Sequence, residues 1–167
     1  MKNLVTTFLF MLALVAAHAA QAQTIRRVNN TGISGTNIYS DLPAALTAAA
    51  AGDIIQVEPS GTPYSATVVT KNVTIVGPGY FLDPTQNSGL QANPTTAAVN
   101  SIDIQAGGEN AYIAGLTVGN YYVRVSNVTV QRCNITGTLT PNYNSPAIPL
   151  TNINVIQCYF SQNGTSA

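Results

Sequence analysis

Three segments in the second half of the chain repeat one pattern of asparagine and apolar residues. Each begins with Asn, has apolar or small residues one and three positions later, and has apolar residues again six and eight positions later. The copies are NAYIAGLTV (Asn110–Val118), NVTVQRCNI (Asn127–Ile135) and NINVIQCYF (Asn152–Phe160), and NVTIVGPGY (Asn72–Tyr80) fits the same frame. The last three copies start 17 and 25 residues apart. Short strands at such a spacing are typical of a β-solenoid, in which each coil contacts only its neighbours.

The apolar pattern extends backward from the asparagines of the last three copies. The pairs that align are Ile102 and Ile104, Val123 and Val125, and Ile148 and Leu150. Because successive side chains of a strand point to opposite faces, these residues are predicted to face inward and their neighbours outward. Each coil is then predicted to contain three short strands joined by bends. Residues 83–96 lack this periodicity and are predicted to form a loop between coils.

A short helix is predicted ahead of the first strand. Ser40 or Asp41 can cap its N-terminus, and Pro43 suits the first turn, where no N–H is needed. The Ala-rich run continues to Ala51, and Gly52 is predicted to end the helix. A helix this short is unstable alone and must pack against the start of the repeats. The first strand is predicted at residues 53–57.

The N-terminal residues 1–22 have the features of a secretory signal peptide. Lys2 gives a positive start, residues 4–17 form an apolar stretch, and Ala20-Gln21-Ala22 is a cleavage signal. A membrane anchor is the alternative, but the apolar stretch is short for a span. We therefore expect a secreted protein, extracellular or periplasmic, with no membrane span after cleavage. Residues 23–37 are predicted to be an irregular or strand-like lead-in, and residues 38–167 to form about four coils.

The charge of the chain argues against nucleic acid as a partner. Removal of residues 1–22 takes away Lys2 and the one His and leaves five basic and six acidic side chains. Binding to a phosphate backbone requires a basic patch, which this composition does not supply. Without His, acid–base chemistry would fall to carboxylates, Lys, Arg or Tyr.

Four asparagines share one position of the repeat, at a bend before an inward apolar residue: Asn72, Asn110, Asn127 and Asn152. Asn tolerates left-handed backbone geometry, and stacked Asn amides can hydrogen-bond to one another. We therefore predict a structural asparagine ladder. The alternative is N-glycosylation, because Asn72-Val73-Thr74 and Asn127-Val128-Thr129 match the acceptor sequence.

Cys133 and Cys158 are predicted to be equivalent residues of successive coils, at an inward position that Leu116 fills one coil earlier. Neighbouring strands lie about 4.8 Å apart, a separation that a disulfide accepts. In a secreted protein such a bond would close a loop of about 25 residues and contribute roughly 3 kcal/mol. Two stacked thiols that behave as small apolar groups are the alternative. Two Cys without His cannot close a zinc site, so no metal is predicted here.

The run SDLPAALTAAAAGDIIQVEPSGTPY resembles the opening of pectate-lyase-like right-handed parallel β-helix proteins, and ENAYIAGLTV and NVTVQRCNIT resemble their coils. The resemblance covers about residues 38–163. It implies an all-β fold, a right-handed single-stranded parallel β-helix with a short N-terminal capping helix. The superfamily includes polysaccharide lyases, polygalacturonase-type hydrolases, epimerases, phage tailspikes and surface proteins without a known reaction. The resemblance therefore implies a fold more specifically than an activity.

The candidates for catalysis are few. Asp103 and Arg124 are predicted to be outward residues of neighbouring coils that stack as a surface ion pair. The alternative, which the resemblance implies, is the remnant of a lyase site in which the carboxylate holds Ca²⁺ and the Arg is the base; no cofactor is expected otherwise. Glu109, Arg132 and Lys71 are weaker candidates, and solubilising outward charge is the simpler interpretation of the two cations.

Four tyrosines are candidates for stacking against sugar rings, because an aromatic ring offers an apolar face and a polar tip. They are Tyr121, Tyr122, Tyr143 and Tyr159. Tyrosines scattered over the surface are the alternative.

Three functions remain open from the sequence. The first is a secreted or cell-surface β-helix module that associates with carbohydrate, without self-sufficient catalysis. The second is a truncated polysaccharide lyase or glycoside hydrolase. The third is a structural or adhesin protein, because no capping element is recognised after the strand that ends at Phe160 and an uncapped coil exposes unpaired strand groups. Either end-to-end self-association or a C-terminal continuation would cover such a coil.

Overall fold

The computed structural model describes residues 23–79, 95–142 and 149–161. The predicted signal peptide, Tyr143, Ile148 and most of the predicted loop at residues 83–96 lie outside these ranges. Strands dominate the described chain, and all named strand pairs are parallel. The all-β prediction with one short helix is therefore confirmed. Within these residues, no helix is long and apolar enough to cross a membrane.

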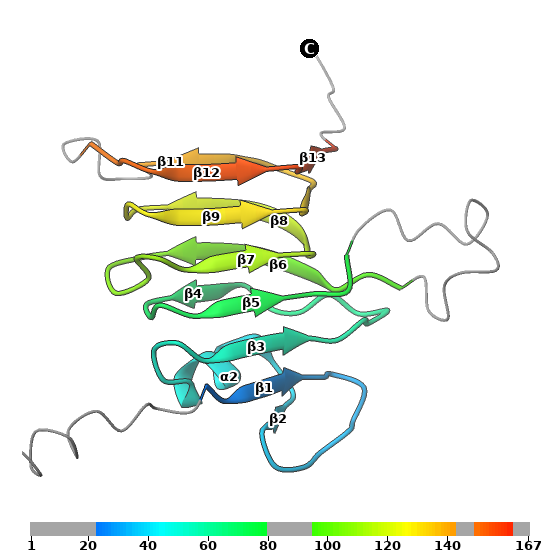
Figure 1. The fold of residues 1–167 in the computed structure, drawn as a ribbon. Coiled ribbons are helices and arrows are strands. Elements are labelled where there is room, and N and C mark those ends of the chain that lie inside the picture. The colour runs from blue at the N-terminus through cyan, green and yellow to red at the C-terminus, as the bar shows by residue number, and fades with distance from the viewer. Residues whose placement is uncertain (1–22, 80–94, 143–148, 162–167) are drawn as a thin grey trace, which may run out of the picture.

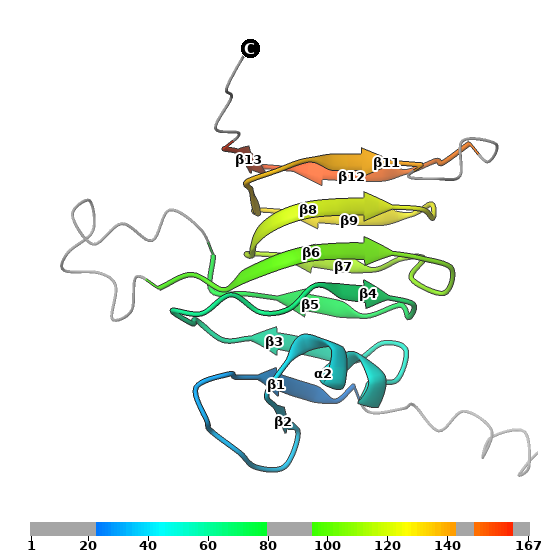
Figure 2. The same ribbon diagram turned by 180° about the vertical axis from the view of Figure 1, so that it is seen from behind.

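The strands form two sheets, which we name by their places in Figures 1 and 2. The front sheet contains, in spatial order, β12 (Ile153–Ile156), β9 (Val128–Gln131), β7 (Tyr112–Ala114), β5 (Thr74–Val76), β3 (Ile54–Val57), β1 (Ile25–Val28) and β2 (Ile38–Tyr39). The back sheet contains β13 (Tyr159–Phe160), β10 (Asn134–Ile135), β8 (Thr117–Val123), β6 (Ala98–Ile104) and β4 (Thr67–Val69), and β11 (Leu139–Pro141) also pairs with β8. From β3 onward the chain visits the two sheets in turn, so each round adds one layer (Figure 1).

The core is the apolar space between the sheets, and stacked rows of like residues fill it. One row of the front sheet places Ile55, Ile75, Ile113 and Val130 at the same level of successive strands. All four side chains are fully buried. Each buried side chain of this size contributes about 1.5–3 kcal/mol through burial. Inward Ile102, Ile104, Val123 and Val125 are buried too, as the alternation predicts.

The predicted register of the front sheet is correct, and that of the back sheet is wrong. Thr74, Tyr112, Thr129 and Asn154 pair in successive strands, which places the four asparagines two residues earlier at one level. In the back sheet, however, Ile102 pairs with Tyr121 and not with Val123. The physical reason is that β8 runs unbroken from Thr117 to Val123. The strand predicted to end at Val118 and the strand predicted around Val123 are therefore one strand, and Tyr121 takes an inward position in it.

The next layer of the back sheet departs further from prediction. The strand that pairs with the end of β8 is β11, whose Leu139 lies beside Tyr121. The predicted partner was Ile148–Leu150; Leu150 is outside any strand and only partly buried. Up to the end of β11 this coil is nearly as long as the preceding one, and its additional residues follow β11. This insertion accounts for the lag of 25 residues in the repeat.

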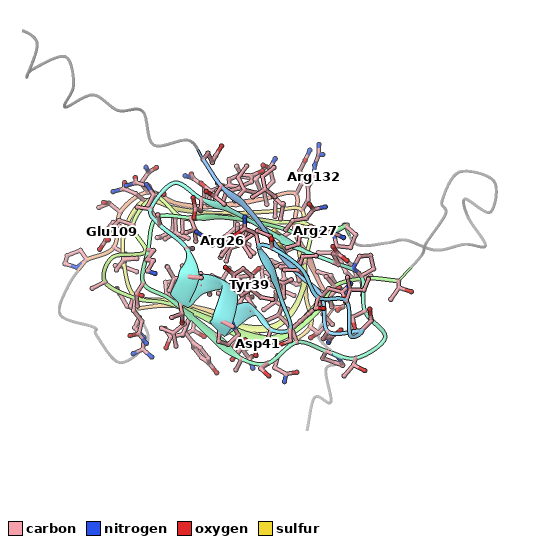
Figure 3. All side chains as sticks on the ribbon, turned by 90° about the horizontal axis from the view of Figure 1, so that it is seen from below. Arg26, Arg27, Tyr39, Asp41, Glu109 and Arg132 are labelled. Atoms are coloured by element: carbon pink, nitrogen blue, oxygen red, sulfur yellow. The ribbon has the colours of Figure 1, made fainter. Side chains whose placement is uncertain are left out.

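Helix α2 (Leu42–Ala48) covers the N-terminal end of the core, as Figure 3 shows from that end. Asp41 caps it, and its Oδ1 accepts a hydrogen bond from Ala44 N at 2.7 Å. The helix ends earlier than predicted, since Ala49 already has extended geometry. Gly52 does not end the helix; with φ of 90° it forms the turn before β3.

A buried carboxylate fixes this turn. Asp53 accepts hydrogen bonds from Thr24 N (3.0 Å), Ala50 N (2.9 Å) and Arg26 Nε (2.8 Å). Burial alone would raise the pKa of Asp53, but these backbone and Arg26 hydrogen bonds outweigh it and lower the pKa below its ordinary value. Asp53 therefore joins the first strand, the helix end and β3, a role that the sequence pattern did not reveal.

Candidate functional site: a groove on the front sheet

Three strands of the front sheet each have a residue with left-handed backbone geometry just before them and another just after them. Strands β7, β9 and β12 each lie between two such residues five positions apart, the pairs Asn110 and Gly115, Asn127 and Arg132, and Asn152 and Gln157. Their φ values lie between 49° and 70°. Few residues other than Gly and Asn adopt this geometry readily. The turns after the strands therefore form a second ladder, which the sequence indicated only through Gly115.

The predicted asparagine ladder is present in part. Asn152 Nδ2 donates to Asn127 Oδ1 at 3.1 Å, as expected for stacked amides. Asn110 has the same geometry, and its N–H donates to the Asn127 carbonyl at 2.9 Å. Asn72 occupies the same level without left-handed geometry, and its carbonyl accepts from Gly52 N at 2.7 Å.

An open groove of about 360 Å³ lies where β5, β7 and β9 reach the second turn ladder. Its small or rigid residues are Gly77, Pro78, Gly79, Ala114 and Gly115, and its larger ones are Val76, Tyr112, Gln131 and Arg132. The turns pack so closely that a Cβ built on Gly77 would lie 2.5 Å from the Gly115 carbonyl oxygen. Because these residues lack side chains of any size, the surface is hollow at this point.

Three polar side chains border the groove. Tyr112 Oη donates to Gln131 Oε1 at 2.6 Å, which fixes the tyrosine ring beside the hollow. Arg132 is exposed and donates from Nε to Gln157 Oε1 at 3.0 Å; among the described residues its Nη groups make no further hydrogen bond. Figure 3 shows Arg132 at the rim of the molecule, well away from Glu109. The groove thus combines an aromatic face, an amide and a guanidinium.

Tyr112 was not among the predicted tyrosines, although the alternation could have identified it. It lies two residues after Asn110, on the outward side of the repeat. Of those predicted, Tyr121 is wrong, because its side chain is fully buried and its hydroxyl donates to Cys133 Sγ at 3.4 Å. Burial raises the pKa of Tyr121 well above its ordinary value. Tyr122 lies half-buried in β8 and Tyr159 lies exposed in β13, so these two described tyrosines are on different strands, and Tyr143 lies outside the described residues.

Asp103 and Arg124 form the predicted ion pair. Arg124 donates from Nε to Oδ1 and from Nη2 to Oδ2, both at 2.7 Å, and Gln105 Nε2 donates to Oδ2 at 2.9 Å. Burial alone would raise the pKa of Asp103, but these hydrogen bonds outweigh it and lower the pKa. The contact crosses the register diagonally, since Asp103 itself is paired with Tyr122.

This pair does not fit a calcium site with an arginine base. Calcium takes six to eight oxygen ligands, whereas both oxygens of Asp103 already accept from Arg124. In the described ranges, no three His, Cys, Asp or Glu side chains gather as a metal site would require. The carboxylate of Glu109 accepts a hydrogen bond from Gly107 N at 2.9 Å.

Lys71 is not the outward solubilising charge that was predicted. Its Nζ donates to the carbonyl oxygens of Leu46 (2.9 Å), Thr47 (2.9 Å) and Ala49 (2.7 Å). These are carbonyls at the C-terminal end of α2, where a cation is favourable. The sequence could not show this contact, because it joins residues more than 20 positions apart.

Cys133 and Cys158 occupy equivalent positions in β10 and β13 layers, level with Leu116, as predicted. Both are free thiols; Cys133 is fully buried and Cys158 partly so. A hydrogen bond between them raises the pKa of Cys133 and lowers that of Cys158 to about 6. The structure therefore agrees with the predicted alternative of two stacked thiols and not with a disulfide.

Comparison with known proteins does not add to this geometry: no family model, no curated protein and no solved structure matches the chain.

Proposed function

We propose that the protein is a secreted right-handed parallel β-helix module that binds polysaccharide in the front-sheet groove and is not an enzyme on its own. The observation that carries this proposal is the ring of Tyr112, held by Gln131 beside a hollow of glycine and alanine, with Arg132 at its edge. Sugar rings stack on aromatic faces and exchange hydrogen bonds with amides and guanidinium groups.

The alternation of the chain between two parallel sheets supports the β-helix. Parallel strands require crossover connections, and these are right-handed in about 98% of cases. The resemblance to pectate-lyase-like proteins points to the same handedness. Under this proposal the predicted signal peptide directs the module to the extracellular space or the periplasm.

The charges near the groove favour an acidic sugar such as a uronate. Among the residues that the structure describes, Arg132 is its one charged lining residue, and no carboxylate of those residues lines it. A guanidinium can hold a carboxylate through two parallel hydrogen bonds. The same composition argues against catalysis there, because glycoside hydrolysis needs two carboxylates across the bound sugar.

Binding is tested by calorimetry with oligogalacturonate, a neutral xylan oligomer and a neutral β-glucan oligomer. Tyr112→Ala is expected to abolish binding of every oligomer that the protein binds, because the stacking face is lost. Arg132→Gln is expected to weaken only the uronate. Tyr122→Ala is the matched control, since it removes the same side chain from the back sheet. Binding that survives Tyr112→Ala would refute the groove as the site.

The enzyme alternative has its own test. Polygalacturonate is incubated with the protein, with and without Ca²⁺, and unsaturated products are followed by ultraviolet absorbance. We expect none. Turnover that disappears in Asp103→Ala would replace the binding module with a lyase.

A further inference from the structure

The last layer of the molecule exposes side chains that its own pattern assigns to the core. Val155 and Phe160 pair in register with Val130 and Ile135, which are fully buried. Val155 is nevertheless 39% exposed and Phe160 48% exposed. Ile153 and Cys158, level with buried Val128 and Cys133, are only partly covered. The core therefore opens to the outside at this end.

Within the described residues, the backbone edges at this end are also uncovered. Strands β12 and β13 end the paths of the front and back sheets, and no described strand pairs with their outer edges or with that of β11, which ends in Pro141 (Figures 1 and 2). Such edges are ordinarily protected by Lys, Pro, bulges or a covering element. From Leu150 to Ser161 the chain carries neither a charged residue nor a proline. Nothing in this stretch opposes the approach of another strand.

The opposite end of the molecule is closed and charged. Helix α2 covers the core there, and β2 pairs with the edge of β1 (Figure 3). The first strand also carries ion pairs, Arg26 with Asp53 and Arg27 with Glu58. An uncharged open coil cannot stack on this end without burying these charges, which is costly. Head-to-tail assembly into a filament is therefore disfavoured.

We propose that the exposed last layer docks the same layer of a second copy of this chain, so that two copies meet tail to tail. Charge does not oppose this contact, because the stretch from Leu150 to Ser161 carries no charged residue on either copy. A two-fold axis across the end brings edge strands together in antiparallel fashion and buries Val155 and Phe160 of both copies. Such an arrangement closes at two copies. This inference does not depend on carbohydrate binding.

The test is the mass of the purified protein by analytical ultracentrifugation, from low micromolar to sub-millimolar concentration. We expect a monomer–dimer equilibrium without larger species. Val155→Lys places a charge in the dimer interface and is expected to weaken dimerisation at least roughly tenfold. Phe160→Lys, in the other sheet, is expected to do the same, and it keeps the test valid if one variant folds poorly. Val68→Lys is the matched control: Val68 is 47% exposed on β4, away from the last layer, and the substitution should leave the dimer unchanged.

Three results would overturn the proposal. A monomer throughout, with β12 amides open to hydrogen exchange, would show that no second copy binds. A monomer with protected β12 amides would show that the chain's own residues 162–167 cover the layer. Growth beyond two copies, or equal weakening by Val68→Lys, would show non-specific association.

Discussion

Substitution of Lys71 by Met tests whether one side chain from a later coil holds the end of α2. Met keeps most of the aliphatic stem and removes the ammonium, which donates to three carbonyl oxygens at 2.7–2.9 Å. A hydrogen bond from a charged donor contributes about 1.5–3 kcal/mol, and a cation at a helix C-terminus about 0.3–1 kcal/mol. Water can replace part of these contacts at the exposed Thr47 carbonyl. We therefore expect the free energy of unfolding to fall by about 2 kcal/mol.

The assay is urea unfolding followed by circular dichroism, with hydrogen exchange to locate the loss. The amides of α2 should exchange faster in Lys71→Met, and those of β9 should not. Arg132→Met is the matched control, since it also removes a cation but loses only the hydrogen bond to Gln157. It should cost less than about 0.5 kcal/mol. A loss in Lys71→Met no larger than in this control would refute the capping role of Lys71.

Three further predictions concern the turns and the ion pair. Asn127→Ala should lower the free energy of unfolding by about 1–2 kcal/mol, measured by urea unfolding, because Ala disfavours the left-handed geometry; Asn127→Gly should cost clearly less, and equal losses would contradict the backbone explanation. Gly77→Ala should cost more than about 2 kcal/mol through collision with the Gly115 carbonyl, whereas Gly61→Ala, with open space around it, should be nearly neutral in the same assay. The lowered pKa of Asp103 means that its ion pair stabilises the fold fully above the unfolded-state pKa of about 4 and that this contribution is lost as the pH falls through the lower folded-state value. Urea titrations from pH 7 to 2.5 should thus show a shallower acid-induced loss in Asp103→Asn, and an unchanged slope would contradict this pairing.

The sequence predicted the front sheet well because a strict local rule governs it. Each strand follows an asparagine at a bend, so the pattern of Asn110 and Asn127 fixes the register directly. The back sheet has no such marker. The merging of two predicted strands into β8 depends on how its layer packs, and periodicity alone placed Val123 opposite Ile102, where Tyr121 lies.

The site was harder to predict than the fold because its residues are brought together across coils. Lys71 and α2 meet through a turn of the chain, and Asp103 reaches Arg124 diagonally. The groove forms because Gly77, Ala114 and Gly115 lack large side chains. Such residues carry no functional group that a sequence motif would reveal. Tyr112 carried a signal through its outward place in the repeat, and Arg132 was predicted only as an outward charge.

The second turn ladder explains why the groove lies where it does. At the level of β7 the ladder residue is Gly115, and the backbone of Gly77, which follows β5 at the same level, packs directly on it. At the level of β9 and β12 the same positions hold Arg132 and Gln157, whose side chains hydrogen-bond to each other above the sheet. The backbone repeats from layer to layer, but side chains cover it only from the level of Arg132 onward. Tyr112 lies beside the uncovered part. The turns that build the coil therefore also shape the proposed binding site. Arg132→Gly should keep the fold, because Gly accepts the left-handed geometry of this turn, but it should remove one wall of the groove.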